Sequence, residues 1–123
     1  MSPTVLLVDD EPDIINTTVL GLRNVGFNVH SFTDPRDAVR HIEVEDCKDC
    51  SVVVSDAKMP QMNGFQLELK LKELQLKIKV IIMTAYEIDK RELEMLFPSM
   101  STVENIIKKP FAPSKLADMI KEM

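Results

Sequence analysis

VVVSD, at residues 52–56, is a short run of β-branched residues that ends on an aspartate. Three further apolar runs also end on polar residues: VLLV (5–8) before Asp9 and Asp10, VIIM (80–83) before Thr84, and II (106–107) before Lys108 and Lys109. Apolar runs without polar alternation are typical of parallel strands that are covered on both faces. Ligands of such sheets lie outside the carboxyl ends of the strands. We therefore expect these polar side chains to meet at one edge of a sheet.

Strand-like and helix-like segments alternate along the whole chain. Pro12 and Pro35 suit the first turn of a helix, Asp34 suits an N-cap, and Gly26 suits a helix end. Strands are expected at 4–8, 28–32, 52–55, 79–83 and about 103–107, and helices from Pro12 to before Gly26, after Asp34, at 65–74, at about 88–97 and after Pro113. Because β-α-β crossovers are right-handed, the sequence predicts an α/β fold with a five-stranded, doubly wound parallel sheet.

Size and charge limit the possible functions. A chain of 123 residues, of which 45% are hydrophobic, suits one compact domain. Its 15 basic and 20 acidic residues give a net charge of -5, which argues against direct binding of nucleic acid. No apolar run approaches the roughly 20 residues that span a bilayer, and the first residues lack a charged leader. We expect a cytoplasmic protein that does not enter the membrane.

Cys47 and Cys50 form a C-x-x-C pair. This is half of a four-ligand zinc set, and it precedes a strand, whereas a redox motif is expected at a helix start. We expect a reduced pair with a passive structural role, with redox or metal binding as the alternative. For His30 and His41, which lie away from the strand ends that carry the acids, we expect structural or surface roles.

The acids at the strand ends require a cation. Asp9, Asp10 and Asp56 raise one another's pKa if they lie close together, and carboxylates without nearby histidine or cysteine favour Mg²⁺. Asp56 is placed to act as a nucleophile that forms an acyl phosphate. Thr84 and Lys109 offer a hydroxyl and a positive charge to the phosphoryl oxygens. The bond before Pro110 is a candidate for the cis form, although trans is more common.

Four motifs together carry a resemblance to a known family: VLLVDDE (5–11), VVVSDAKMPQMNGF (52–65), VIIMTAY (80–86) and IIKKPF (106–111). In order and spacing they resemble the receiver (phosphoacceptor) domain of two-component response regulators, of the stand-alone chemotaxis-regulator-like type. The likeness covers nearly the whole chain. It implies a flavodoxin-like (βα)5 fold and a single receiver domain, 1–123, with no output domain in the chain.

The resemblance also implies roles for individual residues. Asp56 takes a phosphoryl group from the phosphohistidine of a sensor histidine kinase or a histidine phosphotransfer protein. Asp10, Asp56 and the backbone carbonyl of Lys58 hold Mg²⁺, with Asp9 acting mainly through water, and Thr84 and Lys109 bind the phosphoryl oxygens. The signal then passes to an effector protein or along a phosphorelay. Such a domain is a switch rather than a turnover enzyme, and we expect a monomer or weak dimer.

Two features depart from the family pattern. Ile106 stands where a Tyr or Phe ring usually reports the switch, and the segment between Thr84 and Lys109 is a few residues longer than expected. These changes place the switching of the neighbouring face in doubt. Tyr86, at the rim of the site, and Lys58 are expected to modulate the lifetime of the phosphorylated state.

Other functions remain open from the sequence. A Mg²⁺-dependent phosphohydrolase of the haloacid dehalogenase type also uses an aspartate nucleophile after a strand, but such enzymes carry a second acid where this chain has Lys58. The chain is alternatively a receiver fragment of a longer transcription regulator or hybrid kinase. A degenerate receiver that serves as a passive interaction module is disfavoured, because all five site residues are present.

Overall fold

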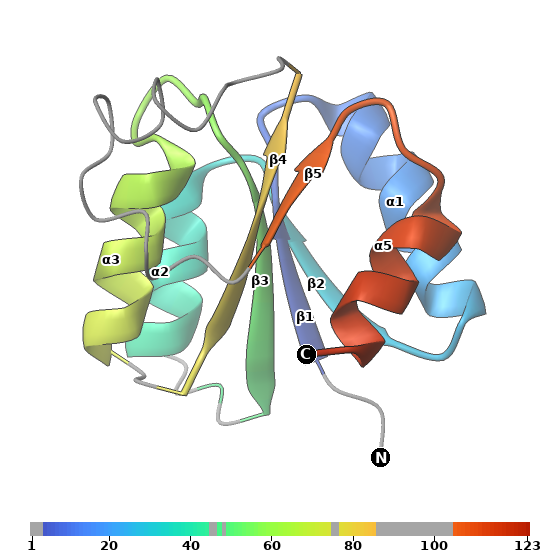
Figure 1. Ribbon diagram of the computed structural model, residues 1–123. Helices are drawn as coiled ribbons and strands as arrows, with labels where there is room; N and C mark the ends of the chain where they lie inside the picture. The colour runs from blue at the N-terminus through green and yellow to red at the C-terminus, as the bar shows by residue number, and fades with distance from the viewer. Residues whose placement is uncertain (1–3, 45–46, 48, 75–76, 86–104) are drawn as a thin grey trace.

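The protein forms a parallel sheet covered by helices (Figure 1). The computed structural model describes residues 4–44, 47, 49–74, 77–85 and 105–123. Within them the strand order is β2-β1-β3-β4-β5. The elements are β1 (Thr4–Val8), α1 (Pro12–Asn24), β2 (Asn28–Phe32), α2 (Pro35–Glu43), β3 (Cys50–Asp56), α3 (Gly64–Leu74), β4 (Lys79–Thr84), β5 (Asn105–Lys108) and α5 (Pro113–Lys121). None of these helices is both long and apolar enough to cross a membrane.

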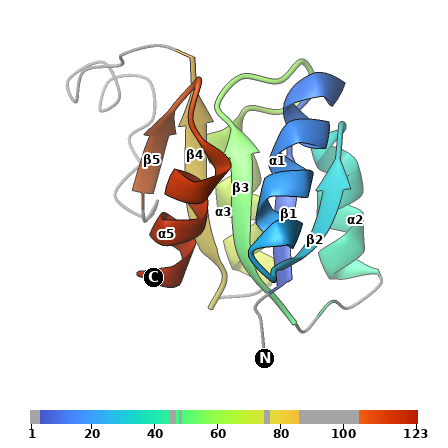
Figure 2. The same cartoon turned by 90° about the vertical axis from the view of Figure 1, so that its right-hand side faces the viewer.

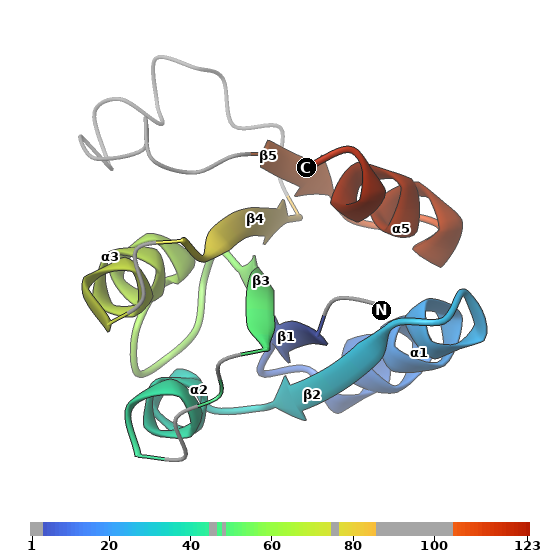
Figure 3. The ribbon, with the colours of Figure 1, turned by 90° about the horizontal axis from the view of Figure 1, so that it is seen from below.

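Helices cover both faces of the sheet, α2 and α3 on one side and α1 and α5 on the other (Figure 3). Each strand contributes side chains to the hydrophobic cores on both faces of the sheet, because successive side chains of a strand point to opposite faces. On β1, Leu6 and Val8 pack in the core beneath α2 and α3, whereas Val5 and Leu7 pack beneath α1 and α5. All four side chains are fully buried, which explains why the run has no polar alternation.

The strand register brings the carboxyl ends of the central strands to one edge (Figure 2). Val8 of β1 pairs with Ser55 of β3, and Asp56 pairs with Met83 of β4. Thr84 then pairs with Lys108 of β5. The residues that follow these strands are therefore neighbours in space although they are distant in the sequence.

Where the structure describes them, the predicted elements agree with the observed ones except near their ends. The strands at 4–8 and 28–32 are confirmed, and β3 starts two residues earlier than the predicted 52–55 run, at Cys50. The first helix ends at Asn24, and Gly26 adopts a φ of 101°, which suits glycine. The strand expected at about 103–107 is described as Asn105–Lys108, and the helix expected at 88–97 lies outside the described residues.

Candidate functional site

Asp9 lies at the end of β1 and is fully buried. Its Oδ1 accepts a hydrogen bond from the backbone N–H of Glu11 at 2.9 Å. The Asp9 backbone N–H donates to the carbonyl of Phe32 at 3.1 Å, which ties the residue to the end of β2. Asp10 and Glu11, by contrast, are exposed. The acid pair therefore divides into one buried carboxylate and one that faces the solvent.

Asp56 is the last residue of β3, and its side chain is 11% exposed. The turn after it is fixed by backbone hydrogen bonds, from Ala57 N–H to the Met83 carbonyl at 2.8 Å and from Gly64 N–H to the Ala57 carbonyl at 3.0 Å. A Cβ at Gly64 would lie 2.5 Å from the Asp56 carbonyl oxygen. The close approach requires glycine at this position, so the loop holds Asp56 at the edge of the sheet.

Lys109 reaches three of the four acids of the site. Its backbone N–H donates to the Thr84 carbonyl at 2.7 Å, and the Lys109-Pro110 peptide bond is cis. The Nζ lies 2.7 Å from Asp9 Oδ2, 3.5 Å from Asp56 Oδ1 and 3.7 Å from Glu11 Oε1. The side chain is 10% exposed. In this state the ammonium pairs mainly with Asp9, and Asp56 is its second partner.

The charges shift the pKa values of both groups. Burial raises the pKa of Asp56 to about 6, the charges of Asp9 and Asp10 add to this, and Lys109 opposes it. Burial alone would lower the pKa of Lys109, but its hydrogen bond to Asp9 and the charges of Asp9, Asp56 and Glu11 outweigh burial and raise it. Lys109 therefore stays charged at neutral pH, while Asp56 ionises only partly below about pH 6.

A cavity of about 190 Å³ lies beside Asp56 and Lys109, and the buried Asp9 is not among the residues that line it. Its lining residues are Asp10, Glu11, Asp56, Ala57, Lys58, Thr84, Ala85 and Lys109. Thr84 is buried at the end of β4, and Lys58 is exposed. The structure thus brings Asp10, Asp56, Thr84 and Lys109 together as the sequence predicts. Glu11 also lines the cavity, although the sequence pattern did not single it out as a site residue.

The remaining candidates that the structure describes do not line this cavity. Ile106 is on β5, partly buried against the core beneath α2 and α3. Tyr86 lies outside the described residues. His30 on β2 and His41 on α2 are near each other, with ring centroids 4.7 Å apart. Neither histidine lines the cavity that holds Asp56.

The acids suit a hard divalent cation. One carboxylate oxygen from each of Asp9, Asp10, Glu11 and Asp56 lies within 4.8 Å of the others. An all-oxygen set of this kind is what Mg²⁺ prefers, and Mg²⁺ usually takes only one or two carboxylates and keeps several waters. Asp9 already uses one oxygen for Glu11 N–H and the other for Lys109. Asp10 and Asp56 are therefore the better direct ligands.

The expectation of a reduced cysteine pair is wrong for this structure. Cys47 and Cys50 form a disulfide, and Cys50 is fully buried as the first residue of β3. The loop before β3 brings the two sulfur atoms together, a conformation that the sequence pattern does not specify. This pair lies at the amino end of β3, whereas Asp56 lies at its carboxyl end.

Comparisons with known proteins agree with this geometry. Residues 5–121 match the family model described as the response regulator receiver domain. The chain is 29% identical over 111 residues to the response regulator SaeR of Staphylococcus epidermidis, covering 90% of this chain and 45% of that protein. It is 27% identical over 118 residues to SaeR of Staphylococcus aureus, covering 96% and 49%. The chain thus spans about half the length of these relatives.

Solved structures share the fold. A CheY-like response regulator receiver domain protein from Methanospirillum hungatei superimposes with a TM-score of 0.84 at 26% identity, covering 99% of this chain and 93% of that one. A response regulator receiver domain protein from Clostridium thermocellum has a TM-score of 0.84 at 23% identity, covering 98% and 92%. With a family match over almost all of its length and the acid-lysine cavity in place, the chain belongs to the response regulator receiver domain family.

Proposed function

We propose that Asp56 accepts a phosphoryl group from the phosphohistidine of a sensor histidine kinase or a histidine phosphotransfer protein. The observation that carries this proposal is the position of Asp56: it borders the cavity, and Lys109 Nζ lies 3.5 Å from its Oδ1. A carboxylate that borders an open cavity and lies close to a positive charge suits nucleophilic attack on phosphorus.

The transfer exchanges one bond to phosphorus for another. A carboxylate oxygen of Asp56 bonds to phosphorus as the bond between phosphorus and the imidazole nitrogen of the donor breaks, and the nitrogen keeps the electron pair. Lys109 neutralises charge on the phosphoryl oxygens, and the Thr84 hydroxyl donates a hydrogen bond to one of them. Both residues line the same cavity as Asp56, which supports these roles.

Receiver domains bind Mg²⁺ at their acidic pocket, and the oxygen cluster of this chain fits that ion. We propose that Asp10, Asp56 and the backbone carbonyl of Lys58 hold it, and that Asp9 acts mainly through water. Bound there, Mg²⁺ neutralises negative charge on the phosphoryl oxygens during transfer. Asp9, for its part, holds Lys109 in place through their 2.7 Å contact.

The output of the switch is also a proposal. The chain passes its signal by binding an effector protein or by a phosphorelay, acts in the cytoplasm as a monomer or weak dimer, and makes no direct contact with nucleic acid. Residues 1–123 act as one receiver unit rather than as a turnover enzyme. The switch is modulated by Ile106, Tyr86 and Lys58. For Lys58 and Tyr86, the test is the rate at which the phosphorylated Lys58→Ala and Tyr86→Ala variants lose phosphate. Unchanged rates in both variants would dismiss a role for these two residues.

The direct test uses acetyl phosphate as donor in the presence of Mg²⁺, with intact mass as the readout. The wild type is expected to gain one phosphoryl group and Asp56→Asn none. Asp37→Asn, which removes an exposed aspartate on α2, is the matched control and should react like the wild type. Equal phosphorylation of Asp56→Asn would contradict the proposal. Release of phosphate over many turnovers from varied phosphomonoesters would favour the phosphohydrolase instead.

A further inference from the structure

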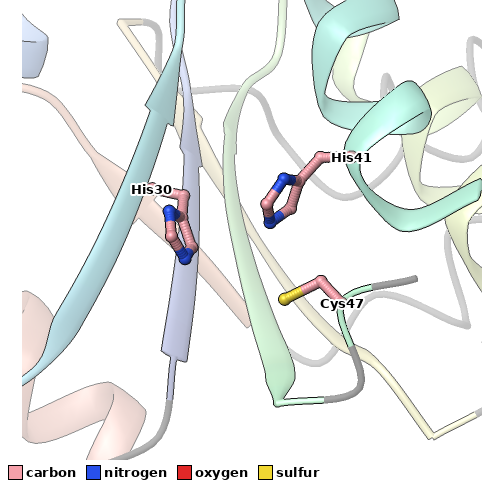
Figure 4. A group of neighbouring side chains, drawn as sticks. All are labelled: His30, His41 and Cys47. Atoms are coloured by element: carbon pink, nitrogen blue, oxygen red, sulfur yellow. The ribbon is translucent and has the colours of Figure 1, made fainter. Parts of the chain in front are cut away.

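Every histidine and cysteine of the chain lies in one small region. The sequence contains two histidines and two cysteines. One ligand atom from each of His30, His41 and Cys47 lies within 4.8 Å of the others, and Cys50 is bonded to Cys47. Figure 4 shows the three side chains facing a common space beside the start of β3. The acidic cavity contains none of these residues, so the two sites are separate.

Four different parts of the chain supply this cluster. His30 comes from β2, His41 from α2, Cys47 from the connection between α2 and β3, and Cys50 from the first position of β3. The fold brings the two imidazoles together: their ring centroids lie 4.7 Å apart with a tilt of 46°, and the ring centroid of Phe32 lies 5.5 Å from that of His41. The cluster is therefore not a local effect of neighbouring sequence.

The donor chemistry indicates zinc. Imidazole nitrogen and thiolate sulfur together suit Zn²⁺, whereas Mg²⁺ prefers oxygen. In a tetrahedral zinc site, bonds of about 2.0 to 2.3 Å place ligand atoms about 3.3 to 3.8 Å apart. The ligand atoms of His30, His41 and Cys47, now within 4.8 Å of one another, need to close by about 1 to 1.5 Å, and after reduction the two sulfur atoms must move apart to about 3.8 Å. Side-chain rotations of exposed His30 and partly buried His41 and Cys47 supply movement of that size.

We propose that, when the Cys47-Cys50 disulfide is reduced, His30, His41, Cys47 and Cys50 bind one Zn²⁺. A dithiol reductant supplies the two electrons and two protons: the sulfur-sulfur bond of the chain breaks, two thiols form, and the reductant becomes a disulfide. Each thiol then loses its proton as zinc binds. The reverse step begins when one of the two thiolates attacks an external disulfide; the second thiolate then attacks the mixed disulfide, which re-forms the Cys47-Cys50 bond and releases the external group as two thiols. The bonded form of the pair and the zinc-bound form therefore exclude each other.

The proposed zinc site would hold three elements together at the end of the sheet opposite Asp56. β3 runs from Cys50 to Asp56, which places the two sites about 20 Å apart at 3.3 Å per residue. Zinc would link β2, α2 and the start of β3, in the same region that the disulfide closes in the oxidised chain. The inference therefore concerns a second, thiol-dependent site and does not depend on phosphorylation of Asp56.

The test titrates the purified chain with Co²⁺ and then Zn²⁺ after reduction with a phosphine, which does not itself supply a thiol. We expect one equivalent of Co²⁺ to give sulfur-to-cobalt charge-transfer absorption and tetrahedral bands, both lost when Zn²⁺ displaces it with a dissociation constant below about 1 μM. The acidic cavity cannot produce the charge-transfer band, because it has no sulfur. The oxidised chain should show no band.

Variants distinguish this site from loose binding to the thiols alone. His30→Ala and His41→Ala should each weaken zinc binding at least tenfold, and Cys47→Ser, which leaves only the Cys50 thiolate, should reduce the charge-transfer band by at least half. Ser31→Ala is the matched control for His30→Ala, because Ser31 is the next residue of β2 and points to the other face of the sheet. His30 is exposed, so its variant should keep the fold, as circular dichroism can verify.

Three results would overturn the proposal: no charge-transfer band in the reduced wild type, wild-type zinc affinity in both histidine variants, or equal metal binding by the oxidised and reduced chains.

Discussion

Replacing Asp56 with asparagine should make the metal-free protein more stable at neutral pH. The buried carboxylate has a pKa of about 6, against an ordinary value of 3.8, because burial and the charges of Asp9 and Asp10 outweigh Lys109. The folded state therefore holds a proton that the unfolded state releases between these two pH values. Above about pH 6 the group is ionised in both states, and its charge destabilises the fold.

The size of the effect follows from the pKa difference. A shift of this size corresponds to about 3 kcal/mol at pH 7. Water reaches the cavity and screens the charge, so we expect Asp56→Asn to gain about 1 to 3 kcal/mol at pH 7.5. As the pH falls through 6, the folded wild type takes up its proton, and the advantage of the variant should decline until about pH 4.

Urea unfolding in EDTA at several pH values measures this difference directly. Asp34→Asn is a control for which the expected change in stability has the opposite sign, because the hydrogen bonds from Arg36 lower the pKa of Asp34. The ionised form of Asp34 stabilises the fold, so its removal should reduce stability at neutral pH and have less effect as the pH falls. If Asp56→Asn is no more stable than the wild type at pH 7.5, or if its advantage does not change with pH, the electrostatic reasoning is wrong.

Three further substitutions test how the site and core are held. Lys109→Met leaves buried Asp9 without its 2.7 Å ammonium partner and should cost about 3 kcal/mol in metal-free urea unfolding; an unchanged midpoint would show that the pair is not stabilising. Gly64→Ala places a Cβ 2.5 Å from the Asp56 carbonyl and should cost about 1 to 3 kcal/mol and slow phosphorylation by acetyl phosphate, whereas wild-type values for both would contradict the close packing. Leu67→Ala, at a fully buried position on α3, should cost about 2 to 5 kcal/mol in thermal or urea unfolding, and a loss below 1 kcal/mol would argue against a packed core there.

The sequence was sufficient for the fold and for most of the cavity. Runs such as 5–8 and 80–83 have no polar alternation, which is expected only of strands covered on both faces. Once these strands are parallel, the polar residues that follow them must meet at one edge. The placement of Asp56, Thr84 and Lys109 around one cavity thus follows from topology without knowledge of side-chain rotamers.

Side-chain partners were harder to predict, because they depend on packing rather than on chain order. The sequence predicted that Lys109 binds the oxygens of a phosphoryl group on Asp56. Its 2.7 Å pairing with Asp9 depends instead on how far the ammonium extends along the carboxyl edge of the sheet. Glu68 of α3, which the sequence pattern did not single out, is 1% exposed with Lys72 3.6 Å away. A charged residue four positions from an opposite charge was the available signal.

The disulfide and the histidine cluster illustrate the same limit. The C-x-x-C spacing permits a disulfide, but the loop conformation decides whether the sulfur atoms meet. His30 and His41 come together only because β2 lies beneath α2, on the face that also buries Phe32. Their positions in the sequence, one on a strand and one on a helix, do not indicate that contact.

The position of Lys109 limits how the site can respond to phosphorylation. Its ammonium lies closer to Asp9 than to Asp56, at 2.7 against 3.5 Å, and so it now compensates a fully buried charge. A phosphoryl group on Asp56 would bring additional negative charge into the same cavity and compete for that ammonium. Any movement of Lys109 towards the phosphoryl group weakens its contact with Asp9, which then needs another source of positive charge. A cation held beside Asp9 would meet that need, so under the proposed function this geometry would link phosphorylation of Asp56 to occupancy of the acidic cluster.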